Sequence, residues 1–119
     1  MKTIPIYDAT KPISCTIANA EIPGRIDLVE RMRANLLAIE RSEHGMLLRF
    51  PNRPDTEADL HRFAVDEKRC CEFWGFDIQE HGDDVILRWD APPAASGLVD
   101  QLLGYFRGEQ PLTAISGLL

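Results

Sequence analysis

A glutamate and two adjacent cysteines, Glu67, Cys70 and Cys71, are the residues of this chain best suited to chemistry. They lie in a segment with helical spacing of apolar residues, and residues three and four apart are neighbours on a helix surface. One carboxylate and two thiols are therefore expected to share one patch. Soft cations prefer thiolates, so the set suits mercury(II), arsenic(III), copper(I) or cadmium. A structural zinc site normally uses four Cys or His ligands instead.

The third cysteine of the chain, Cys15, is a candidate third ligand. It lies on the inward face of a strand predicted over residues 13–18, and whether it meets Cys70 or Cys71 depends on a strand order that the sequence leaves open. Taken singly, each cysteine is more typical of packing, because free cysteine behaves as a small buried hydrophobe. With an odd count and no secretion signal, free thiols are expected.

A disulfide between Cys70 and Cys71 within a regular helix is disfavoured. Consecutive Cα atoms are about 3.8 Å apart, below the usual disulfide range. Adjacent thiols on one helix face make better sense as soft-metal ligands, or as alternative partners for a third thiol.

Glu67 is the misfit in an otherwise clean amphipathic pattern. If Leu60 is placed at zero and each residue turns about 100°, Glu67 falls at about −20°, inside the apolar arc. A buried, unpartnered carboxylate costs several kcal/mol. The carboxyl is therefore neutral with a raised pKa, paired with a cation such as Arg33 on the inward side of the preceding helix, or facing a cleft or ligand. It also has the simpler alternatives of reaching solvent at the helix edge or forming one structural ion pair.

Redox and nucleophilic chemistry are less favoured than metal binding. A reactive thiolate needs a low pKa, whereas the Glu67 carboxylate and the C-terminal end of a helix both raise a thiol pKa. The sequence has no convincing Cys–His pair, phosphate loop or zincin motif. An enzyme that uses Glu67 as a buried general base is a third hypothesis, and it requires a cleft open at that residue.

Length and charge narrow the class of protein. The 119 residues predict one domain. A net charge of −6, from 13 Lys+Arg against 19 Asp+Glu, argues against a nucleic-acid partner. No stretch approaches the roughly 18 apolar residues of a membrane span, and the N-terminus lacks an apolar leader. We therefore expect a cytoplasmic protein with no nucleic-acid or membrane partner.

Segments in which apolar residues alternate, as in strands, are interspersed with segments of helical spacing. This pattern predicts a single two-layer α/β sandwich (α+β) in the order β-α-β-α-β-β-α, with a mixed sheet that includes a C-terminal hairpin and helix. We expect an extended arm over residues 1–12, the domain over 13–108 and a C-terminal tail over 109–119. The expected elements are strands over 13–18 and 46–50, helices over 22–41 and 56–74, a hairpin of strands 76–79 and 85–89, and a helix over 95–106.

An apolar patch is a second functional candidate. Val65 and Phe73 fall on the outward side of the second predicted helix, with Trp74 at its end. Exposed together they would suit a partner or self-association, whereas the apolar tail would otherwise cover them. The alternative to metal binding is therefore a non-catalytic interaction or dimerisation domain with buried structural cysteines. Its partner would be a second copy of the chain, in a homodimer, or another protein.

The chain resembles a family of small uncharacterised bacterial proteins over about residues 13–106. The resemblance implies that Cys15, Arg25, Glu67, Cys70 and Cys71 belong to one pattern, and it adds no mechanism. Here Trp74 stands where related chains often carry a small or aliphatic residue. The matching segments are Ser14-Cys15-Thr16, the helix with Pro23 and Arg25, Leu47-Leu48-Arg49-Phe50, Glu67-x-x-Cys70-Cys71-x-Phe73 and Trp89-Asp90-Ala91-Pro92.

The leading hypothesis is a protein that binds a soft metal or metalloid. Cys15, Cys70 and Cys71 would be the thiolate ligands. Glu67 would be a fourth ligand or a proton acceptor, and either Arg25 or Arg33 would hold it in place.

Overall fold

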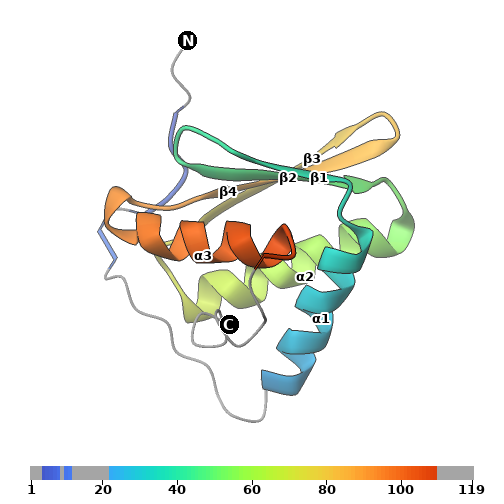
Figure 1. The fold of residues 1–119 in the computed structure, drawn as a ribbon, viewed down its shortest axis with the longest axis horizontal. Helices are drawn as coiled ribbons and strands as arrows, with labels where there is room; N and C mark the ends of the chain where they lie inside the picture. The colour runs from blue at the N-terminus through green and yellow to red at the C-terminus, as the bar shows by residue number, and fades with distance from the viewer. Residues whose placement is uncertain (1–3, 9, 12–21, 110–119) are drawn as a thin grey trace.

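The computed structural model describes residues 4–8, 10–11 and 22–109, except for the side chains at positions 22, 23 and 70. The described strands form one antiparallel sheet in the order β1-β2-β4-β3. Figure 1 shows the three α-helices gathered on one face of this sheet. The elements are α1 (Ile22–Asn35), β1 (Ala38–Arg41), β2 (Gly45–Pro51), α2 (Pro54–Cys70), β3 (Gly75–His81), β4 (Asp84–Asp90), the 3₁₀ turn η2 (Pro93–Ala95) and α3 (Ser96–Phe106).

This arrangement confirms the predicted α+β sandwich and its C-terminal hairpin and helix. The expectation of a mixed sheet was wrong for the described strands, because each neighbouring pair runs antiparallel. The strand predicted over residues 13–18 and the tail beyond residue 109 lie outside the described residues. Among the described helices, none combines the length and apolarity needed to cross a bilayer.

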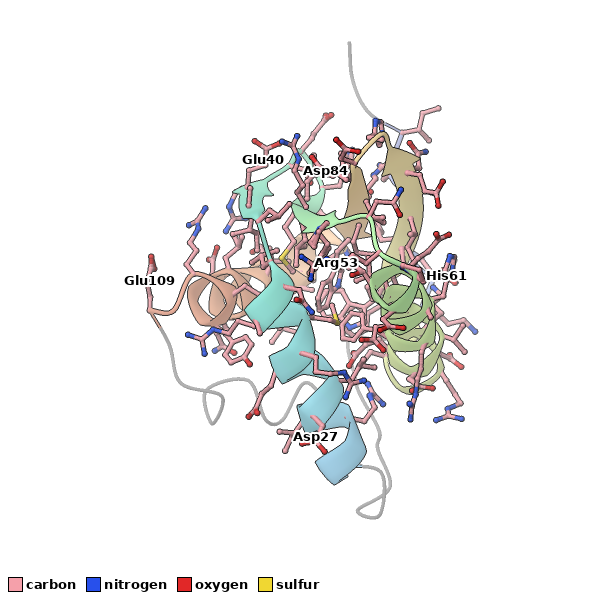
Figure 2. All side chains as sticks on the ribbon, turned by 90° about the vertical axis from the view of Figure 1, so that its right-hand side faces the viewer. Asp27, Glu40, Arg53, His61, Asp84 and Glu109 are labelled. Carbon is pink, nitrogen blue, oxygen red and sulfur yellow. The ribbon has the colours of Figure 1, made fainter. Side chains whose placement is uncertain are left out.

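The two central strands show why the sheet has one dry face. Side chains alternate along a strand, and β2 places Met46, Leu48 and Phe50 on the helix side, each fully buried. Their cross-strand partners on β4 are likewise buried, and they are Trp89, Leu87 and Val85. The intervening residues face away from the helices, and Figure 2 shows Glu40 and Asp84 on that open side.

The first helix is shorter than the sequence indicated. A helix was expected over residues 22–41, but α1 ends at Asn35 and Ala38–Arg41 forms the edge strand β1. The backbone of β1 pairs with β2, and the Ser42 N–H donates to the Gly45 carbonyl (2.9 Å) in the turn between them. Hydrogen bonding to an otherwise open edge of β2 outweighs a few more residues of helix, because tertiary pairing overrides local propensity.

The second helix ends earlier than expected, which corrects the predicted apolar patch. It was expected to reach Trp74, but α2 ends at Cys70. The Lys68 ammonium donates to the carbonyls of Glu72 and Trp74 (2.5 Å each) and so holds the turn that follows. This turn directs Phe73 and Trp74 into the core, where both are fully buried, and only Val65 of the predicted patch is exposed.

The described part of the N-terminal arm lies across one end of the sheet, where β3 begins and β4 ends. The Ile6 N–H donates to Asp90 Oδ2 (3.1 Å), and the Asp8 N–H donates to the Phe73 carbonyl (3.2 Å). The Arg88 guanidinium donates to the Ile4 carbonyl. The arm is therefore attached through its main chain.

Candidate functional site

A buried ion pair joins the first two helices. Arg25 in the first turn of α1 contacts Glu67 in the last turn of α2, through Nη2 and Oε1. The side chains are 4% and 1% exposed, so the pair is shielded from solvent. Arg33, the other candidate partner, lies elsewhere, with its guanidinium carbon 4.8 Å from the centroid of the Tyr105 ring.

Two opposing effects set the protonation of Glu67. Burial raises the pKa of its carboxyl from 4.5 to about 7, although the Arg25 guanidinium favours the ionised form and lowers it. The Trp74 indole also favours ionisation, yet its N–H makes no hydrogen bond of standard geometry with any described residue. Glu67 is thus paired with Arg25 and still harder to ionise than an ordinary glutamate.

The second carboxylate oxygen of Glu67 is an unsatisfied acceptor. Oε2 is buried and accepts no hydrogen bond within the described part of the chain. A buried polar atom without a partner is costly, and native structures usually explain one through water, an ion or function. Because the side chain is only 1% exposed, the carboxyl faces no open cleft, so the general-base hypothesis lacks the access it requires.

Cys71 follows α2 directly, one helical turn after Glu67. Its N–H donates to the Glu67 carbonyl (2.6 Å), and its side chain is fully buried. Cys71 is disulfide-bonded, so the expectation of free thiols was wrong for this residue. The chain has two other cysteines, Cys15 and Cys70, and both side chains lie outside the described part of the structure.

The predicted ligand set is therefore only partly placed. The structure brings Glu67, Arg25 and Cys71 together, while Cys15 and Cys70 are not described. Across residues 4–8, 10–11 and 22–109, no three His, Cys, Asp or Glu side chains form a metal-binding group. With two candidate ligands outside that search, the metal site stays a prediction.

An aromatic layer surrounds the C-terminal end of α2. The Trp74 and Trp89 rings meet edge to face with centroids 5.2 Å apart, and Phe63 packs against Trp89 at the same distance. Burial in this core, rather than any single ring, is the physical reason that Glu67 resists ionisation, since Trp74 itself favours the ionised form. The sequence indicated a buried Glu67, but it could not show that the turn after Cys70 folds Trp74 back onto it.

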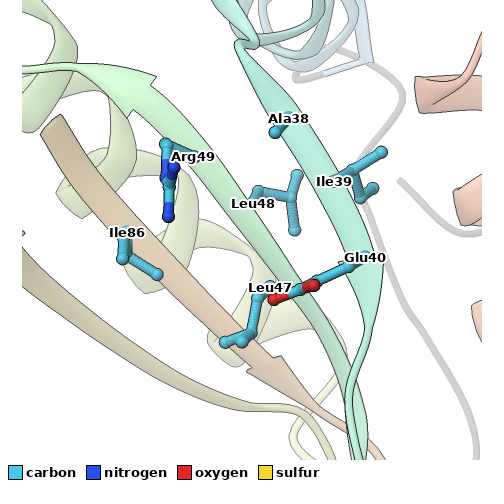
Figure 3. Close-up of a pocket in the computed structure, with 7 residues that line it drawn as sticks. All are labelled: Ala38, Ile39, Glu40, Leu47, Leu48, Arg49 and Ile86. Atoms are coloured by element: carbon cyan, nitrogen blue, oxygen red, sulfur yellow. The ribbon is translucent and has the colours of Figure 1, made fainter.

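A second feature lies on the open face of the sheet. A shallow groove of about 190 Å³ runs across β1, β2 and β4. Glu40, Arg49, Leu47 and Ile86 are among the residues that line this groove. Figure 3 shows that the side chains of Glu40 and Arg49 do not touch each other. Sequence reasoning missed this groove because the groove depends on β1. The residues of β1 had been assigned to the preceding helix on the basis of their helical spacing.

Comparisons with known proteins add no relative. No protein-family model, curated protein or solved structure matches the chain. The function must therefore be argued from the site itself.

Proposed function

We propose that the reduced protein binds a soft metal or metalloid ion through Cys71 and the cysteine to which it is bonded. The observation that carries this proposal is the disulfide of Cys71, a buried residue one turn after Glu67 whose main chain is bonded to that of Glu67. A disulfide requires two cysteine sulfurs in contact, so its reduction leaves two thiols side by side. Neighbouring thiolates are the preferred ligands of soft cations.

Glu67 and Arg25 support the same site. Thiols must lose protons when they bind a metal, and the Glu67 carboxyl, with a pKa of about 7, lies one turn from Cys71. It is therefore placed as a proton acceptor or as an additional ligand. Arg25 holds the carboxylate through Oε1. The oxidised protein, by contrast, has no thiolate at Cys71 to offer.

Native mass spectrometry tests this proposal. The protein, reduced with a phosphine that is then removed, is mixed with one equivalent of mercury(II), arsenite or zinc. We expect a one-equivalent adduct with the thiophilic ions, absent from the oxidised protein and from Cys71→Ser. Cys70→Ser and the double variant Cys70→Ser/Cys71→Ser show which thiols participate.

Two results would contradict metal binding. One is the absence of any adduct on reduced wild-type protein whose circular dichroism shows an intact fold. The other is an adduct that forms equally on oxidised and reduced protein, because it would then lie away from the disulfide. Both comparisons use wild-type protein, so they hold even if Cys71→Ser fails to fold.

The open-face groove favours a second candidate function, self-association. In the register of the sheet Glu40 lies next to apolar Leu47, and Arg49 lies next to apolar Ile86. In a two-fold dimer each copy presents the same patch, so Glu40 of one copy can meet Arg49 of the other. We expect Leu47→Glu to lower the mass found by light scattering, whereas Leu37→Glu, at an exposed leucine outside the groove, leaves it unchanged. A wild-type protein that is already monomeric would exclude this function.

A further inference from the structure

We propose that the end of the sheet around Asp90, Arg88 and Gly75 is a docking groove for an extended peptide, and that the chain's own arm occupies part of it. The groove would bind main-chain groups of its ligand. Once the arm is displaced, it would accept such a peptide from another molecule. This inference is independent of the cysteines.

The arm contacts the groove through every second residue from Ile4 to Asp8, with a bend at Tyr7. Ile4 offers its carbonyl to Arg88, while Ile6 and Asp8 offer their N–H groups to Asp90 Oδ2 and to the Phe73 carbonyl. In an extended chain, alternate residues direct their main-chain groups to the same edge. Residues 4 and 6 present one edge to the groove in this way, and the Asp8 N–H also faces it after the bend at Tyr7. No side chain of these three residues is needed for those bonds, so another extended peptide can make the same ones.

The receiving side is built for this contact. Asp90 is fully buried and paired with Arg88 in a two-pronged contact of 2.6 and 3.2 Å, which fixes both side chains. The carboxylate then accepts the Ile6 N–H, and charge-assisted hydrogen bonds are the stronger kind. A charged pair at this position is costly to bury unless its remaining bonds are made, and the arm makes them.

Gly75 leaves the space that the arm occupies. It pairs with Asp90 in the sheet register, and a Cβ at this position would overlap the backbone of Ile6 and Tyr7. Absence of a side chain lets one backbone approach another closely. The groove thus combines a charged pair that binds main-chain groups with a glycine that admits them.

The arm does not fill the groove. Beside Ile6 a cavity of about 490 Å³ continues between α2 and β3, with an apolar wall that includes Ala64, Val65 and Phe76. Val65 is 66% exposed, while Ile4 is 80% exposed and contributes little side-chain burial. The best ligand is therefore an extended peptide with a larger apolar residue in place of Ile6.

The test displaces the arm in the full-length chain without altering the groove. Proline has no N–H, so the double variant Ile6→Pro/Asp8→Pro loses both donors to Asp90 and Phe73. A fluorescent peptide of residues 1–11 is titrated into this variant and into the wild type, and binding is followed by anisotropy. We expect at least tenfold tighter binding to the double variant, because the wild-type groove is occupied.

Two further variants make the result specific to the groove. Adding Gly75→Ala to the double variant should reduce peptide binding at least tenfold, whereas adding Gly97→Ala, where a Cβ meets nothing within 4 Å, should not. A peptide with Ile6→Phe should bind more tightly than the natural sequence. The proposal is overturned if the folded double variant binds no peptide, or if Gly75→Ala and Gly97→Ala behave alike.

Discussion

Glu67 shows how one buried carboxyl can be both paired and reluctant to ionise. Arg25 supplies the opposite charge, but burial raises the pKa of the carboxyl to about 7. The folded protein therefore holds the Glu67 proton over a pH range in which the unfolded chain has lost it. Over that range proton binding favours the folded state.

The stability that Glu67 contributes should fall as pH rises. Its folded pKa of about 7 lies above the ordinary 4.5, so the contribution is complete below about pH 4.5 and is lost by about pH 7. The difference of roughly 2.5 units corresponds to about 3 kcal/mol at most. Urea unfolding of wild type and Glu67→Gln at pH 5 and pH 8 measures it. The wild type should lose more stability between the two; parallel pH profiles would contradict the raised pKa.

Removing Arg25 should be strongly destabilising. Arg25→Met leaves the Glu67 carboxyl buried without its cation, and the loss of one partner of a buried pair costs about 3–5 kcal/mol. It should also raise the pKa of Glu67 above 7, because Arg25 lowers it. The matched control is Arg31→Met on the same helix, whose pair with Asp59 (3.2 Å) is partly exposed. Exposed pairs contribute about 1 kcal/mol or less, so equal effects in the two variants would refute this account.

Sequence reasoning found Glu67 and left its partner open between Arg25 and Arg33, and the structure pairs it with Arg25. The helical wheel places Glu67 in the apolar arc, and its 1% exposure confirms that position. The same counting pointed to Arg33, because periodicity shows which residues face inward and not how far along the helix the neighbour crosses. The crossing of α1 over α2 brings Arg25 to the last turn of α2 and leaves Arg33 over Tyr105.

The element scale explains the two misplaced helix ends. Ile39 fits both a helix over residues 22–41 and an edge strand. Its spacing from Leu36 is compatible with a helix, but it does not exclude a strand that begins after the helix has ended. The edge of β2 is available for hydrogen bonding, and this determines that residues 38–41 form a strand. The local spacing of apolar residues contains no information about that edge. The β3–β4 hairpin was predictable because its strands are adjacent in sequence and the turn at Gly82 has the positive φ of 62° that favours glycine.

The turn that creates β1 gives a test at this scale. Gly45 lies against β4, where a Cβ would overlap the Trp89 carbonyl. Gly45→Ala should therefore lower the free energy of unfolding by about 1–3 kcal/mol, as overpacking does. Gly97→Ala in α3 has open space and should instead stabilise the helix by up to about 1 kcal/mol. Chemical unfolding measures both, and effects of the same sign would contradict the packing described for β2.

At the scale of the whole molecule, a one-sided sheet and a disulfide define the architecture. The alternation of apolar residues predicted the two layers, because each face of a strand has its own character. The order β1-β2-β4-β3 was not predictable, since it depends on which edges meet after the chain crosses the helix layer. The Cys71 disulfide was missed for the same reason, because cysteine pairing follows from tertiary proximity.

Reduction of the disulfide should weaken the whole fold. A native disulfide typically contributes about 2–4 kcal/mol, mainly by restricting the unfolded chain. We expect the melting temperature of wild-type protein to fall on addition of a phosphine reductant. Cys71→Ala should melt at the same temperature with and without reductant. A wild type that is indifferent to reduction would contradict the bond at Cys71.

The position of the two tryptophans makes the protein its own optical sensor. Trp74 and Trp89, the only tryptophans in the sequence, are buried in edge contact. The main-chain N–H of Trp74 donates to the main-chain carbonyl of disulfide-bonded Cys71 (3.2 Å), which keeps the two residues close. Disulfides quench indole emission at short range, and adjacent indoles exchange excitation energy. Both fluorophores should therefore brighten together when Cys71 is reduced, so the redox state of this buried sulfur can be followed in real time without any label.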